Sequence, residues 1–331
     1  MIQIKRSIAT VLVVGSVAWA GSPSVPEQYQ ANLRTSVSDQ LCRGARALEK
    51  AQGDFAVAKG KSAATWEWEQ GSGAAADNTS GIVALALVRT SKGCGPAKAF
   101  ERYAKARAAE HDAARFLFDA DVETLALAGP VLGDTRYRAT ALAAFERRYS
   151  GATGREAVER LRMVRSPNKA LLGYDAALAI RAGLAVNQDK KAKEIADAVL
   201  ATPGWAAGAD TEGFLTTSRG AMLEALALLD GAKGKAYASA RRDLVQTLKK
   251  EQAGDGSFAG RNTQATAYAV RGLAKSGDES AQGAVAAGRR WLRLTQLTAG
   301  TWATFNDLVP EPFVGDHVPE VTAEAMLALA D

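Results

Sequence analysis

Acidic side chains recur near the start of five of six apolar segments of the sequence, and carboxylates at such positions are suited to acid–base chemistry. Two carboxylates that flank a glycosidic bond can cleave it, one as proton donor and the other as base or nucleophile. A single acid buried among apolar side chains keeps its proton and can donate it to a substrate. The candidate acids are Asp77, Asp121, Asp175, Glu212 and Glu320.

Two aromatic residues and one histidine accompany these acids. Tyr174 and Trp205 offer flat surfaces on which a ligand can stack, and His317 stands directly before the last apolar segment. Three of the candidates named so far also have a simpler interpretation. Asp, Asn and Thr residues before a helix satisfy its free amides, so Asp77 and Asp121 are also interpreted as helix caps. His317 is equally interpreted as a solvated loop residue.

Metal and cofactor chemistry finds little support. The sequence has two histidines and two cysteines, and neither cysteine follows an aspartate at the start of an apolar segment. A zinc site built from Asp, Cys and His is therefore not expected, and no cofactor is predicted.

The first 20 residues have the three parts of a secretory signal peptide. Lys5 and Arg6 form a basic start, an apolar stretch runs from Ile8 to Val17, and Ala18-Trp19-Ala20 supplies a small-residue cleavage site. An uncleaved anchor is the alternative, but the apolar stretch is shorter than the roughly 20 residues that span a bilayer. We expect a periplasmic or secreted protein, not integral to a membrane, whose mature part is one domain of residues 21–331.

Export places the two cysteines, Cys42 and Cys94, in an oxidising compartment, which favours a disulfide between them. The alternative is two separate buried thiols. The formal net charge of +5 over 331 residues is small, and no tract of Lys and Arg stands out, so a nucleic-acid partner is not expected.

Two kinds of helical segment alternate along the chain. Six are rich in Ala and Leu and nearly uncharged: 82–88, 125–132, 176–186, 221–229, 265–274 and 322–330. The others are charged and amphipathic: 29–51, 97–116, 135–149 with 155–164, 190–200, 235–252 and 281–294. No sustained alternation of apolar and polar residues predicts a strand.

Helices that are apolar on every face must be buried on every face. The six apolar segments begin at intervals of roughly 40 to 60 residues, which is typical of a repeat architecture. An open stack would leave many of their side chains in water, whereas a closed ring would not. The sequence therefore predicts an all-α fold, an (α/α)6 toroid with six apolar helices inside a ring of charged ones.

A repeated motif near the C-terminus carries a family resemblance. One copy comprises Gln252, Asp255, Gly256 and Phe258, and the second comprises Trp291, Gln296, Gly300 and Trp302. This pattern resembles the Gln-Trp repeat of squalene and hopene cyclases, which share an α/α toroid with protein prenyltransferases. Gln52 with Trp66 or Trp68 is a fainter copy. The motif covers the chain from about residue 235, and the rest resembles the family only in its alternating helices.

The resemblance implies a fold and not an activity, because the motif is structural in that family. Its protonating cyclases carry an Asp-x-Asp-Asp-Thr-Ala stretch, and residues 262–265 and 318–321, the aligned positions here, lack the middle aspartate. We therefore expect an exported toroid that binds a small-molecule, lipid or glycan ligand, or an envelope protein, without family-type catalysis. The alternatives are an enzyme acting on an isoprenoid or polysaccharide through carboxylates at the mouth of the ring, and a structural partner with a filled centre.

Overall fold

The computed structural model describes residues 27–57, 60–67, 73, 78–90, 94, 97–109, 117–162, 173–205, 212–231, 234–306 and 318–330. Within these ranges the chain forms 14 α-helices, one short 3-10 helix and one two-stranded hairpin. Here no helix is both long and apolar enough to cross a membrane.

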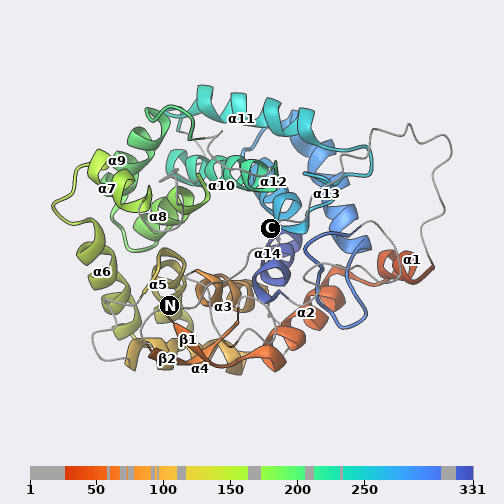
Figure 1. Cartoon of the computed structure of the whole chain (residues 1–331), viewed down its shortest axis with the longest axis horizontal. Coiled ribbons are helices and arrows are strands. Elements are labelled where there is room, and N and C mark those ends of the chain that lie inside the picture. Colours follow the sequence, from red (N-terminus) through yellow and green to blue (C-terminus); the bar gives the residue numbers. More distant parts are fainter. Residues whose placement is uncertain are drawn as a thin grey trace, which may run out of the picture.

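Six helices form the inner ring. They are α3 (Thr79–Thr90), α5 (Asp119–Leu132), α8 (Gly173–Ala185), α10 (Glu212–Asp230), α12 (Thr263–Lys275) and α14 (Pro319–Ala330). Each packs against the next in this order, and α14 packs against α3, so that the ring closes (Figure 1). The prediction of an all-α toroid is confirmed.

The inner helices are buried because they have no polar face. In α3, every residue from Ile82 to Leu87 is at most 2% exposed. Small side chains also let the helices approach closely. A Cβ atom at Gly220 of α10 would lie 2.4 Å from the backbone of Tyr268 in α12, so only glycine fits there.

The outer ring consists of charged, amphipathic helices. They are α1 (Glu27–Arg34), α2 (Val37–Ala51), α4 (Ala97–Ala109), α6 (Arg136–Tyr149), α7 (Gly154–Arg162), α9 (Asp189–Leu200), α11 (Ala238–Glu251) and α13 (Gln282–Leu294), with the 3-10 turn η2 (Glu279–Ala281) before α13. The stretch 29–51, predicted as one helix, is two. Ser36 ends the first and caps the second, since its hydroxyl accepts a hydrogen bond from the Asp39 amide at 3.0 Å.

Side-chain amides join the two ends of the outer ring. The Asn32 amide group of α1 donates to the carbonyls of Leu294 and Gln296, at 2.9 and 2.7 Å. In return the Gln296 amide group donates to the Gln40 carbonyl of α2 at 2.8 Å. The first and last outer helices therefore meet, as ring closure requires.

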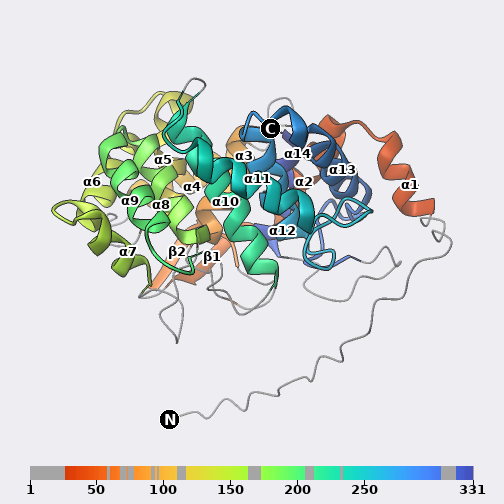
Figure 2. The same ribbon diagram turned by 90° about the horizontal axis from the view of Figure 1, so that it is seen from above.

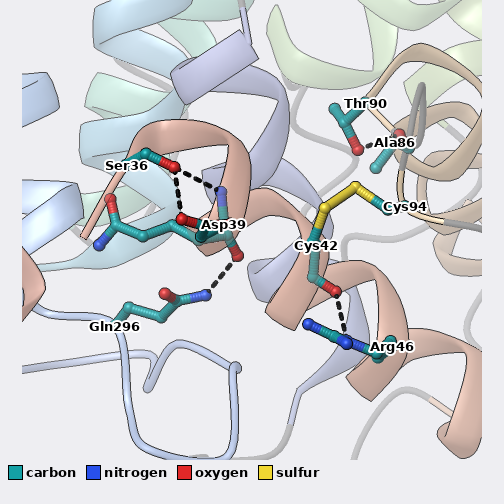
Figure 3. Close-up of a disulfide and its surroundings, with 9 residues drawn as sticks. Ser36, Asp39, Cys42, Arg46, Ala86, Thr90, Cys94 and Gln296 are labelled. Carbon is teal, nitrogen blue, oxygen red and sulfur yellow. Dashed lines mark hydrogen bonds between the residues drawn. A yellow bond between two sulfur atoms is a disulfide. The ribbon is translucent and has the colours of Figure 1, made fainter.

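A disulfide links Cys42 of α2 to Cys94, in the connection from α3 to α4 (Figure 3). The two Cα atoms are 5.1 Å apart, a usual separation for a disulfide. The predicted pairing is confirmed, and it fastens an outer helix to the following repeat.

One hairpin departs from the all-helical expectation. Strands β1 (Gly53–Val57) and β2 (Gly60–Thr65) pair antiparallel between α2 and α3, with Phe55 opposite Ser62. The strands are short and rich in Gly and Ala, so they carry too little alternation to be recognised in the sequence.

Candidate functional site

Two glutamates on α14 form the candidate site. Glu320 and Glu324 are four residues apart, so both side chains project from the same face of the helix. That face points into the ring, and the two residues are 4% and 0% exposed. An acidic pair this deeply buried requires specific partners to hold it.

Glu320 is held by two hydroxyl groups from other inner helices. The Tyr174 hydroxyl donates to its Oε1 at 2.7 Å, and the Thr79 hydroxyl donates to its Oε2 at 2.6 Å. Thr79, Tyr174 and Glu320 are each the first or second residue of an inner helix. Three helices therefore present their N-terminal ends to one another here, which defines the mouth of the ring.

Glu324 is held much less completely. The Gln264 amide group donates to its Oε1 at 3.1 Å, whereas its Oε2 has no hydrogen-bond partner among the described residues. The nearby Tyr268 hydroxyl also lacks one. Burial, together with the charge of Glu320, raises the pKa of Glu324 well above the usual value for a glutamate. Glu324 is thus a carboxylic acid that retains its proton at pH values where an ordinary glutamate has lost it.

Gln264 connects Glu324 to the surface. It is the second residue of α12 and is only partly buried. Its amide group contacts the Glu324 carboxyl directly, so it links that buried acid to a partly exposed residue at the start of α12. Tyr268 lies one turn further along α12, and its ring packs edge-on against Tyr174, with centroids 5.3 Å apart.

Further from the mouth, a belt of buried ion pairs passes around the ring. Its pairs are Arg89–Glu123 at 2.9 Å, Glu123–Arg181 at 2.8 Å, Arg181–Glu224 at 3.2 Å and Glu224–Arg271 at 2.9 Å. These five residues come from α3, α5, α8, α10 and α12, with basic and acidic side chains alternating. We call them the charge belt. If basic and acidic residues continued to alternate, the next helix, α14, would carry an acid, and Glu324 is that acid. It forms no ion pair within the described part of the chain.

The belt carboxylates remain ionised because their neighbours are cations. Burial by itself would raise the pKa of Glu224, but the guanidinium groups of Arg181 and Arg271 lower it to about 2. The pKa of Glu123 is likewise lowered, because Arg181 and Arg89 outweigh its burial. The site therefore shifts the pKa values of its acids in opposite directions: upward for Glu324, and downward for Glu123 and Glu224 of the belt.

The charge belt does not follow from a pattern of apolar segments that are nearly uncharged. Most of these segments do contain one charged residue, such as Arg181, Glu224 or Arg271, and in a wholly buried helix a lone charge must have a partner. A lone charged residue in an apolar segment is therefore the sequence feature that predicts a buried ion pair. It also points to Glu324, which lies in the segment 322–330.

The predicted acids do not all gather at the mouth. Asp121 turns to the outer ring, where it pairs with Arg107 at 2.9 Å and accepts a hydrogen bond from Tyr103. It also accepts from the Phe118 amide at 2.9 Å, in keeping with its alternative interpretation as a helix cap. Asp175 is buried in the first turn of α8.

Three other predicted site residues are less informative. Glu212 is the first residue of α10, and the structure does not describe its side chain. Asp77 and His317 lie outside the described residues. Trp205 is partly buried against Gly173, and Tyr174 is buried rather than available for stacking.

The motif glutamines occupy the ends of outer helices. Gln252 donates to the carbonyls of Gly256 and Ala284, at 3.0 and 2.8 Å, and so joins α11 to α13. Gln296 donates to Gly300 at 2.9 Å in the same way, besides its bond to Gln40. The indole of Trp302 donates to the Leu292 carbonyl at 2.7 Å.

The remaining motif residues shape the turns between these helices. Asp255 accepts hydrogen bonds from the amide and hydroxyl of Ser257. Gly256 has a φ of 93°, which glycine adopts without strain. Phe258 and Trp291 are fully covered. Gln52 repeats the arrangement near the N-terminus, donating to Ala64 and Ala99.

Solved structures similar to this chain include a glycoside hydrolase and a terpene cyclase. A family 76 glycoside hydrolase from Bacteroides thetaiotaomicron matches with a TM-score of 0.61 and 13% identity, over 90% of this chain and 78% of that one. A possible member of the GH105 family from Salmonella enterica matches with a TM-score of 0.59 and 14% identity, over 89% and 92%. The type II terpene cyclase MstE from Scytonema matches with a TM-score of 0.55 and 16% identity, over 89% and 97%.

The fold is an α/α toroid. At 13–16% identity these likenesses establish the architecture and nothing finer. No protein-family model matches the sequence, and no curated protein shows a significant match. Within the ranges that the structure describes, no three His, Cys, Asp or Glu side chains are placed to hold a metal ion.

Proposed function

We propose that this toroid cleaves a polysaccharide at the mouth of its ring, with Glu324 as the proton donor. The observation that carries the proposal is the pair of buried carboxyl groups of Glu324 and Glu320 on one face of α14, of which Glu324 has a raised pKa, because glycosidic cleavage requires two carboxyl groups of which one donates a proton. Glu324 donates its proton to the leaving glycosidic oxygen as the C–O bond breaks. A water molecule attacks the anomeric carbon and gives its proton to Glu320.

The unsatisfied atoms beside Glu324 support this assignment. Buried polar atoms without partners cost stability, and native proteins tolerate few of them outside functional sites. Glu324 Oε2 and the Tyr268 hydroxyl have no partner at full hydrogen-bond geometry among the described residues, although the Tyr268 hydroxyl interacts with the Glu324 carboxyl and lowers its pKa in part. The hydroxyl groups of a sugar are suited to both, since they donate as well as accept.

The charge belt disfavours an isoprenoid substrate. A polyene needs an apolar cavity, whereas five ion-paired side chains pass around the ring near Glu324. The link to squalene cyclases that the Gln-Trp pattern suggests is therefore a proposal about ancestry and not about substrate.

The test is to incubate the purified protein with neutral and acidic polysaccharides and to measure the reducing ends that cleavage releases. E324Q is expected to lower kcat by about 10²- to 10⁴-fold, the usual contribution of a general acid. D197N is the matched control, because Asp197 is a partly exposed acid of the outer helix α9. Full activity in E324Q would overturn the assignment.

A non-catalytic binding module is the second candidate. The observation in its favour is the depth of the acidic pair, with Glu320 already bonded to Thr79 and Tyr174. A wild-type protein that binds a polysaccharide but releases no reducing ends would support this candidate over the enzyme.

We further propose that the protein is exported and cleaved after Ala20. The Cys42–Cys94 disulfide supports this, because disulfides persist in oxidising compartments. Intact mass measurement of the protein recovered from a periplasmic extract should give a chain beginning at Gly21. Recovery of the chain from cytoplasm with its first 20 residues would contradict it.

A further inference from the structure

Helix α10 extends beyond its neighbours at the mouth of the ring. The Tyr174 amide, at the start of α8, donates to the Ser218 hydroxyl of α10 at 3.2 Å, which aligns the two residues. Residues 212–216 of α10 therefore continue past the start of α8, by roughly 7 Å at 1.5 Å per residue. Figure 2 shows this end of α10 reaching beyond the adjacent helices, on the side that carries β1 and β2.

A phenyl ring stands on this extension, and a second stands beside it. Phe214, the third residue of α10, is 42% exposed, and Phe305 is 39% exposed. Phe305 forms a β-bridge with Asn262, the N-cap of α12. The Thr263 amide secures the same segment by donating to the Thr304 carbonyl at 2.8 Å. Since α10 and α12 are neighbours, the two rings occupy the same end of adjacent helices.

Exposed apolar side chains are divided between the two ends of the ring. Among the described residues, four large hydrophobic side chains are exposed: Val131, Phe214, Leu228 and Phe305. Val131 and Leu228 lie near the C-terminal ends of α5 and α10, away from the mouth. Phe214 and Phe305, the two aromatic residues among the four, lie at the mouth. Gln264, which is hydrogen-bonded to Glu324, lies at the same end of the ring.

Two charged side chains that the structure describes on these segments are paired. Arg219 of α10 forms an ion pair with Glu251, and Arg261, next to Asn262, pairs with Asp255 at 3.0 Å. The part of the rim that the structure describes therefore combines exposed aromatic faces with neutralised charge. Such a surface favours a ligand that is apolar on its faces, polar at its edges and without net charge.

We propose that Phe214 and Phe305 form a subsite that stacks the pyranose rings of a neutral polysaccharide and delivers the chain to Glu324. This inference rests on the proposed function and adds to it the class of substrate and two specificity-determining residues. Pyranose rings present C–H groups on their faces and hydroxyl groups at their edges. The faces pack on the phenyl rings, while the hydroxyl groups remain hydrogen-bonded to water or to polar neighbours such as Gln264.

The experiment measures binding by isothermal titration calorimetry in an E324Q background, which prevents cleavage. The probes are cellohexaose, xylohexaose and chitohexaose, which are neutral, and hexagalacturonate, which is acidic. At least one neutral probe is expected to bind more tightly than hexagalacturonate. Each of F214A and F305A should then raise its Kd about fivefold to tenfold, in the range expected for loss of an aromatic contact.

L228A is the matched control. Leu228 lies on the same helix as Phe214 and is 41% exposed, but at the opposite end. An equal loss of affinity in L228A, unchanged affinity in F214A and F305A, tighter binding of hexagalacturonate, or no binding of any probe would overturn the subsite. So would sedimentation showing a wild-type dimer that F305A dissociates, because a second copy would then cover the rings.

The two proposals fail in different ways. If Glu324 is not the proton donor, wild-type protein binds the neutral probe without cleaving it, or E324Q cleaves it as fast as wild type, and the two Phe variants still weaken binding of the probe. If the subsite is wrong, cleavage persists with unchanged KM in F214A and F305A.

Discussion

Tyr174 and Glu320 lie on helices α8 and α14, which face each other across the inner ring, and their hydrogen bond of 2.7 Å spans its centre. This bond links two opposite helices of the inner ring directly. The bond also fixes the carboxyl group of Glu320 next to that of Glu324. One contact therefore serves both the joining of inner helices and the arrangement of the candidate site.

Y174F is predicted to destabilise the protein by about 1 to 3 kcal/mol, because it removes a buried hydrogen bond to a carboxyl group. The phenyl ring preserves the packing against Tyr268. Urea-induced unfolding measures the change. Y237F is the control, since the Tyr237 hydroxyl also donates to an acid, Asp197, but from the outer ring. A loss in Y174F no larger than in Y237F would contradict a central role for the bond.

E324Q is predicted to become more stable, relative to wild type, as the pH rises. Burial raises the pKa of Glu324 in the folded protein, whereas in the unfolded chain a glutamate has a pKa of about 4.3. The favourable contribution of the protonated acid is therefore complete below about pH 4.3 and is lost as the pH rises through the folded pKa. Glutamine does not titrate, so the difference grows by up to about 1.4 kcal/mol per pH unit.

Urea titrations between pH 4 and 8 test this dependence, because urea does not screen charges. E224Q is the control. Arg181 and Arg271 hold the pKa of Glu224 at about 2, so its contribution is present throughout this range and is lost only below it. The difference between E224Q and wild type should stay flat from about pH 5 to 8. A flat difference for E324Q as well would show that Glu324 ionises normally.

R181M is predicted to destabilise the ring by about 3 to 5 kcal/mol, because it leaves Glu123 and Glu224 buried with one cationic partner fewer. The exposed pair Lys193–Asp197 of α9 provides the comparison. K193A should change the stability little, since water screens that pair. Chemical unfolding gives both values, and similar losses in the two variants would mean that the charge belt is not a cohesive element.

The sequence predicts the ring well because burial is a local property of each helix. A segment such as 82–88 has no polar face, so its position inside the fold follows without knowledge of its neighbours. The charge belt is different in kind. Its partners are separated by 34 to 58 residues, so no spacing within one segment reveals that Arg89 and Arg181 share Glu123.

The candidate site shows the same limit. Glu320 was predicted as a mouth residue because it begins an apolar segment, which is visible in the sequence. The role of Glu324 depends on complete burial and on the distance to Glu320, both of which exist only in the folded ring. Gln264 likewise becomes informative only through its contact with that acid.

Removal of the disulfide tests how far the covalent link supports the ring. The double variant C42S/C94S is predicted to lose about 4 kcal/mol, because the bond closes a loop of 52 residues in the unfolded chain and so lowers its entropy. Wild-type protein reduced with dithiothreitol should lose the same amount, whereas the variant should not respond to the reductant. Since Cys42 belongs to α2, which packs against α14, weakening this joint should also expose the acidic pair. Hydrogen exchange at α14 should therefore accelerate more than at α8, and equal acceleration at both helices would show that the disulfide stabilises the ring only globally.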